Sequence, residues 1–143
     1  MEEKRIMVCL DGSKDSIRGL RTAILFARQS DSMIVGVHID TTQGAITAMS
    51  APKIKEEKWS NETRKIMQIA RDKAKQRGVK FEGIVIAGYK AGNDLANFAN
   101  NPKSKIEQIV IAARGLGFPK ETFFGSTSNF VLYKAKVPVT VVK

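Results

Sequence analysis

Five short apolar segments, separated by stretches with helical spacing, constrain the fold of this chain more than any other feature. Each segment is strand-length, and the first two end in an acidic residue. Short apolar runs without polar alternation are typical of strands buried on both faces of a parallel sheet. The predicted strands lie within Arg5–Asp11 (RIMVCLD), Met33–Asp40 (MIVGVHID), Val79–Gly88 (containing GIVIAG), Ile106–Ala113 (IEQIVIAA) and Val137–Val142 (VPVTVV).

The stretches between the strands have the period of amphipathic helices. In Lys14–Gln29, apolar residues recur at intervals of three and four, and Ser13 is placed to cap the helix. A long helix is predicted from Ile54 to Gly78, with Trp59 on its apolar face. Two shorter helices follow. Asn93 is the predicted cap of one, and Gly125-Ser126 opens the other, with Phe130, Val131 and Ala135 facing inward.

Strands that alternate with helices predict one α/β fold. Right-handed crossovers would wind it into a five-stranded parallel sheet sandwiched by four helices, a doubly wound, Rossmann-like arrangement. The 143 residues suit a single domain spanning 1–143. Two stretches without a clear period, Thr41–Pro52 and Arg114–Phe124, are predicted loops.

Composition narrows the class of protein. Apolar residues make up 43% and charged residues 27%, as in folded globular proteins. No apolar run approaches the roughly 20 residues of a membrane span, and the first residues do not resemble a signal peptide, so we expect a cytoplasmic protein without membrane contact. The single cysteine, Cys9, is interpreted as a packing residue. The net charge of +10 attracts polyanions, but along the sequence these charges form no single tract.

A ligand site is expected at the carboxyl ends of the strands, where doubly wound sheets bind their ligands. The segment after the fourth strand reads Ala112-Ala113-Arg114-Gly115, then nine residues, then Gly125-Ser126-Thr127-Ser128. Free N–H groups at the start of the helix, with nearby hydroxyls and Arg114, would favour a phosphate. An ordinary serine-capped helix in a loop explains the same spacing equally well.

This segment, together with Asp11-Gly12-Ser13 and the closing Pro138-Val139-Thr140-Val141-Val142, resembles the universal stress protein family over nearly the whole chain. Gly-x-x-Gly-x9-Gly-Ser/Thr is the ATP-binding signature of that family. Ala112 replaces its first glycine here, and its methyl group would narrow the approach to a ribose. The resemblance implies an adenine nucleotide alpha-hydrolase-like fold.

The resemblance also implies a set of binding residues. Leu10, Asp11 and His38 would lie near the adenine base, although the family usually has an apolar residue in place of His38. Ala112, Arg114, Gly115, Gly125 and Ser126 would contact ribose and phosphates, followed by Thr127 and Ser128 in the same helix start. The implied ligand is ATP or a related adenine nucleotide, with Mg²⁺ or Mn²⁺ as the accompanying ion. A lone histidine on a strand is also commonly a packed or hydrogen-bonded residue.

The family further implies a regulatory role in stress response, through an unknown protein partner, and a homodimer paired through Val137–Val142. Three alternatives stay open: slow ATP hydrolysis, a basic dimer that binds nucleic acid or another polyanion, and a dimer that binds no nucleotide. No catalytic residue or protein-built metal site is evident in the sequence, so an enzymatic role is not assigned.

Overall fold

The computed structural model describes residues 3–42, 52–88, 90–114 and 125–143. Within these ranges, six strands form one sheet in the order β3-β4-β2-β1-β5-β6. Five of the strands are mutually parallel, and the two-residue strand β3 is antiparallel to its neighbour β4. The strands are β1 (Lys4–Cys9), β2 (Ser32–Asp40), β3 (Lys53–Ile54), β4 (Phe81–Ala87), β5 (Gln108–Ala112) and β6 (Val139–Val142).

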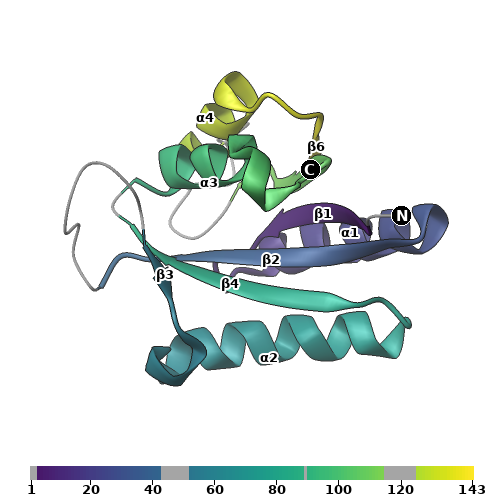
Figure 1. Ribbon diagram of the computed structural model, residues 1–143, viewed down its shortest axis with the longest axis horizontal. Helices are drawn as coiled ribbons and strands as arrows, with labels where there is room; N and C mark the ends of the chain where they lie inside the picture. Colours follow the sequence, from purple (N-terminus) through teal and green to yellow (C-terminus); the bar gives the residue numbers. More distant parts are fainter. Residues whose placement is uncertain (1–2, 43–51, 89, 115–124) are drawn as a thin grey trace.

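Helices cover both faces of this sheet (Figure 1). On one face, α1 and α2 pack over a core that includes Leu20, Ile34 and Met67, all fully buried. On the other face, α3 and α4 pack over a second core around Met7 and Val35. The helices are α1 (Lys14–Ser30), α2 (Asn61–Gln76), α3 (Ala91–Asn100) and α4 (Ser126–Lys134), with short 3₁₀ turns at η1 (Glu56–Lys58) and η2 (Pro102–Ser104).

The predicted doubly wound α/β sandwich is therefore confirmed, with one short edge strand added. The turn that ends β1 also forms as predicted. The Ser13 hydroxyl accepts a hydrogen bond from the Ser16 N–H at 3.0 Å, and α1 begins at Lys14.

Among the described residues, no helix has the length and apolar character needed to cross a membrane.

The predicted start of the second long helix is wrong. Lys53 and Ile54 pair with β4 instead, and the Trp59 indole N–H donates to the Ile54 carbonyl at 2.9 Å. The helix begins only at Asn61, because the Ser60 hydroxyl accepts the Thr63 N–H at 3.1 Å and so caps it. Trp59 is buried as expected, but outside the helix.

Two smaller predictions about the other face are also wrong. Asn93 does not cap α3, because this helix begins at Ala91 and has no side-chain cap. The carboxamide oxygen of Asn93 instead accepts a hydrogen bond from the Lys134 ammonium at 2.9 Å. Phe130 is 42% exposed, while Val131 is fully buried as predicted. The predicted loops at 41–52 and 114–124 lie mostly outside the described residues.

Candidate functional site

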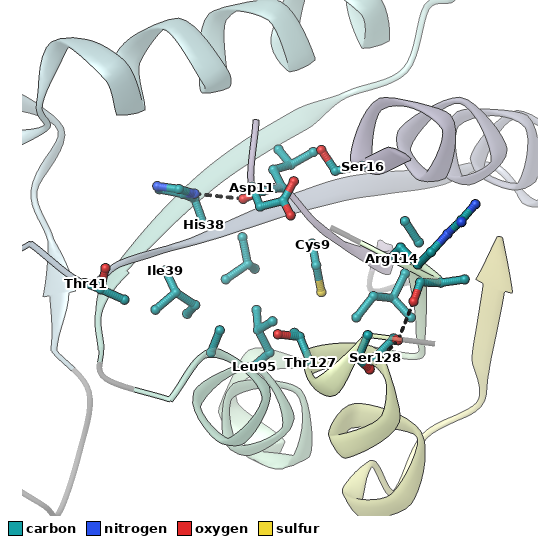
Figure 2. A pocket seen from close by; sticks show the side chains of 17 residues that line it. Cys9, Asp11, Ser16, His38, Ile39, Thr41, Leu95, Arg114, Thr127 and Ser128 are labelled. Atoms are coloured by element: carbon teal, nitrogen blue, oxygen red, sulfur yellow. Dashed lines mark hydrogen bonds between the residues drawn. The ribbon is translucent and has the colours of Figure 1, made fainter. Parts of the chain in front are cut away.

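A pocket of about 410 Å³ opens at the carboxyl ends of β1, β2 and β5, between the first turns of α3 and α4. Figure 2 shows Asp11 and His38 on one wall, Thr127 and Ser128 on the opposite wall, and Cys9 between them. The volume falls within the range of about 300–1,000 Å³ that is usual for small-molecule sites. The lining consists of Cys9, Leu10, Asp11, Ser16, Val37, His38, Ile39, Thr41, Ala91, Leu95, Ile111, Ala112, Ala113, Arg114, Gly125, Thr127 and Ser128.

The first wall is built by the turn that follows β1. Leu10 continues the sheet, since its N–H donates to the Val37 carbonyl at 2.9 Å. The next residue, Asp11, accepts the Ser13 N–H on its Oδ1 at 2.9 Å, and Gly12 turns the chain with φ at +85°. A positive φ is favourable for glycine and costly for other residues. This local turn holds the Asp11 carboxylate at the pocket wall.

His38 joins the ends of β1 and β2 across the same wall. Its Nδ1 lies 2.8 Å from the Leu10 carbonyl oxygen. A carbonyl oxygen only accepts hydrogen bonds, so Nδ1 carries the proton. In the neutral ring, Nε2 is therefore left as a hydrogen-bond acceptor. The histidine is both hydrogen-bonded and part of the pocket, so the two interpretations of this residue are compatible.

The opposite wall is the first turn of α4, which is tied directly to the end of β5. The Gly125 N–H donates to the Ala113 carbonyl at 2.7 Å. The Ser128 hydroxyl, which is 2% exposed, lies 2.8 Å from the Ala113 carbonyl and 3.0 Å from the Gly125 carbonyl. These contacts fix the start of the helix against the sheet.

The start of α4 has the properties of an anion site. The first N–H with a carbonyl acceptor four residues back is that of Asn129, which donates to Gly125 at 3.0 Å. The N–H groups of Ser126, Thr127 and Ser128 therefore have no acceptor within the helix. Together with the helix dipole, they create a positive potential at this wall of the pocket. Arg114 adds a cationic side chain to the same lining.

The structure brings together most of the residues that the sequence singled out. Eight of them line the pocket: Leu10, Asp11, His38, Ala112, Arg114, Gly125, Thr127 and Ser128. Ser126 is exposed in the first turn of α4 and is not part of the lining. Gly115 lies outside the described residues.

Sequence reasoning missed the apolar part of the pocket. Ala91 and Leu95 from α3, with Val37, Ile39 and Ile111 from the strands, form much of the lining. Their residue types are those of ordinary core positions, so nothing in the sequence distinguishes them from the interior. Only the packing of α3 beside the strand ends shows that they face a cavity.

Cys9 lies in the pocket but is poorly suited to act as a nucleophile. Burial, and secondarily the nearby Asp11 carboxylate, raise the pKa of its thiol to about 12. At neutral pH the thiol therefore stays protonated, and the thiolate is the reactive form. This agrees with its interpretation as a packing residue.

The acidic side chains near the pocket do not form a metal site among the described residues. Asp40 is buried at the end of β2, and its Oδ1 accepts the Thr42 N–H at 2.9 Å and the Thr42 hydroxyl at 2.6 Å. Across the described residues, no group of three or more His, Cys, Asp or Glu side chains is arranged to hold a metal ion. A nucleotide-bound ion would depend on phosphate oxygens for most of its ligands.

Comparison with known proteins identifies the family. The model of the Universal stress protein family matches residues 3–143. The chain belongs to this family. It is 28% identical to Universal stress protein YxiE of Bacillus subtilis, covering 97% of this chain and 98% of the relative. It is 25% identical to Universal stress protein MJ0531 of Methanocaldococcus jannaschii, covering 98% and 82%.

A solved structure of the family has the same fold. The universal stress protein from Archaeoglobus fulgidus, solved in complex with dAMP, superposes with a TM-score of 0.73 at 25% identity. The match covers all of both chains. The overall fold described above is thus that of a universal stress protein.

Proposed function

We propose that this chain is an adenine-nucleotide-binding regulatory protein of the stress response, acting in the cytoplasm as a homodimer with an unidentified protein partner. One observation carries the nucleotide proposal. The N–H groups at the start of α4, which have no acceptor within the helix, lie across one 410 Å³ pocket from Asp11 and His38. One wall therefore suits phosphate, and the other suits the polar edge of a base. The relative from Archaeoglobus fulgidus, solved with dAMP, supports the choice of adenine.

The proposed ligand lies with its phosphates against Gly125, Ser126, Thr127 and Ser128. Arg114 supplies positive charge there, and Gly115 of the signature is included in the proposed set of binding residues. The adenine lies against Leu10, Asp11 and His38, above the apolar side chains from α3. ATP, with Mg²⁺ or Mn²⁺ bound to its phosphates, is the expected form. The proposal is a binding role and includes no hydrolytic step.

At Ala112 this chain departs from the family signature, which has a glycine at this position. The residue lines the pocket and is 8% exposed. We propose that the methyl weakens binding without preventing it. Ala112→Gly, which restores the signature, is then expected to raise the affinity.

Calorimetric titration of AMP, ADP, ATP and cyclic AMP into nucleotide-free protein tests the proposal. We expect a micromolar dissociation constant for at least one nucleotide. Gly125→Val should weaken binding at least tenfold, because a branched side chain would occupy the phosphate approach. Asn129→Val is the matched control, since it adds the same side chain to an exposed position of α4 outside the lining. Equal affinity in a folded Gly125→Val protein would contradict the pocket assignment.

The homodimer part of the proposal depends on β6. This strand is an edge of the sheet, with β5 on one side, and carries three valines in four residues. An apolar edge strand is a template for pairing with another strand. Sedimentation equilibrium should give twice the chain mass of 15.8 kDa. A monomer mass up to 100 µM protein would refute the dimer but leave the nucleotide site untouched.

A further inference from the structure

The folded chain separates its charges between the two helical layers. Helices α1 and α2, with their C-cap residues Asp31 and Arg77, carry ten basic and four acidic side chains, whereas α3 and α4 carry one of each. Ten of the 24 basic residues of the chain thus belong to this one helical layer. The basic residues of this layer are Lys14, Arg18, Arg21, Arg28, Arg64, Lys65, Arg71, Lys73, Lys75 and Arg77.

A groove of about 520 Å³ lies between α1 and α2 in this basic layer. Four cationic side chains line it: Arg21 and Arg28 from α1, and Lys73 and Arg77 from α2. The rest of the lining is Ile24, Leu25 and Gln76, so the described lining contains no carboxylate. Within the described part of the chain, none of the four cations has an acidic group within ion-pair distance. Their charge is therefore available to a ligand.

Helix stability explains only part of this arrangement. Arg28 and Lys73 lie in the last turns of their helices and Arg77 is the C-cap of α2, positions where a cation interacts favourably with the helix dipole. Arg21 is in the middle of α1, where the dipole gives no such preference. The spacing of Arg21 and Arg28, two turns apart, places both on the side of α1 that faces α2. A site for an external anion accounts for all four side chains together.

We propose that this groove, named here the α1–α2 groove, binds the phosphodiester backbone of a double-stranded nucleic acid without reading its sequence. Three of the four cations are arginines, whose guanidinium groups bind phosphate oxygens in a bidentate manner. The groove shares no lining residue with the proposed nucleotide pocket. It is therefore a second site, and its test is independent of the first.

The lining favours a duplex over other polyanions. No aromatic side chain lies in the described lining, so the groove offers no platform on which single-stranded bases would stack. Leu25, which is 51% exposed, is the one exposed apolar side chain of that lining. Tight protein interfaces usually depend on several large apolar or aromatic anchors. A backbone of regularly spaced phosphates needs only the cations.

Fluorescence anisotropy with a fluorescein-labelled 20-base-pair DNA duplex, and with the RNA duplex of the same sequence, tests the proposal. Four phosphate contacts predict a slope of about −3.6 for the logarithm of the association constant against that of the salt concentration. Affinity should then fall about 150-fold between 50 and 200 mM salt. The DNA and RNA arms show which duplex the groove prefers, and preference for either supports the proposal.

The decisive comparison uses two variants with the same net charge. The groove variant combines Arg21→Gln, Arg28→Gln, Lys73→Gln and Arg77→Gln. The control variant combines Lys103→Gln, Lys105→Gln, Lys136→Gln and Lys143→Gln, all exposed and outside α1 and α2. We expect the groove variant to lose most of the salt slope and at least tenfold in affinity at 50 mM salt, while the control keeps the wild-type slope.

Three results would overturn the proposal: equal weakening in both variants, unchanged binding in the groove variant, or tighter groove-dependent binding of oligoglutamate or a dT20 single strand than of the duplexes. Circular dichroism shows whether each variant is folded. If the quadruple variant is not, the pairs Arg21→Gln/Arg77→Gln and Arg28→Gln/Lys73→Gln should each lose about half of the slope. An unchanged slope in both pairs would equally refute the site.

Discussion

Ser128 offers the sharpest test of how the pocket is held together. Its hydroxyl bonds to the carbonyls of Ala113 and Gly125, and so joins the end of β5 to the start of α4. Ser128→Ala removes these bonds, but neither carbonyl loses its last partner. The Ala113 carbonyl keeps the Gly125 N–H, and the Gly125 carbonyl keeps the Asn129 N–H. No buried group is left unsatisfied, so only the net value of the hydroxyl bond is lost.

That net value is about 1 kcal/mol. For a chain of this length, it corresponds to a melting temperature lower by about 3 °C. Urea denaturation should show a lower midpoint with an unchanged slope, since the surface exposed on unfolding stays the same. Nucleotide affinity should also fall several-fold, because the start of α4 is less firmly positioned.

Ser126→Ala is the informative counterpart. Ser126 is exposed and lies two residues earlier on the same helix. Removal of its hydroxyl should leave the free energy of unfolding within about 0.5 kcal/mol of wild type. If this hydroxyl contacts a phosphate directly, the affinity for the nucleotide should fall. An unchanged free energy of unfolding in Ser128→Ala would show that the hydroxyl bond contributes nothing, and a loss above about 3 kcal/mol would show that a carbonyl is left without a partner. Either result would contradict the hydrogen bonding described for this serine.

Two further predictions concern the interior. A Cβ at Gly36 would lie 2.7 Å from two ring atoms of Phe81 and 2.8 Å from Leu10 Cδ1. Gly36→Ala should therefore destabilise the fold by about 1–3 kcal/mol in urea denaturation, and a change below about 0.5 kcal/mol would contradict the packing. The pKa of the Cys9 thiol is raised to about 12 in the folded chain, from its ordinary value of 9.0. The protonated thiol therefore contributes its full stabilisation below pH 9, and this contribution is lost progressively as the pH rises toward 12. Relative to Cys9→Ala, wild type should lose about 1 kcal/mol of stability between pH 8 and 10. A stability difference that stays constant over this pH range would contradict the raised pKa.

The sequence predicts the fold well because alternating strands and helices leave few ways to cover a sheet. Its errors occur where tertiary contacts override local pattern. Lys53 and Ile54 have helix-compatible neighbours, but pairing with β4 draws them into the sheet. Phe130 has an apolar side chain at a plausible core position, yet it stays 42% exposed, while its Cβ packs against Gly92.

The candidate site was predicted less completely than the fold. The polar wall could be located because Asp11, Gly125 and their neighbours form a recognisable spacing. The apolar wall could not, since Ala91 and Leu95 resemble any core residues. The α1–α2 groove shows the same limit: Arg21 and Lys73 are distant in the chain, and only the packing of two helices brings their charges together.

Nucleotide binding at the carboxyl ends of the strands is tested most directly by titrating AMP into uniformly ¹⁵N-labelled protein and recording backbone amide spectra. We expect saturable shifts at Asp11, His38 and Thr127, on both walls of the pocket. The amides of Arg21 and Arg77 in the α1–α2 groove should stay in place. Absence of shifts at millimolar AMP, or saturable shifts confined to the groove, would contradict nucleotide binding at the carboxyl ends of the strands.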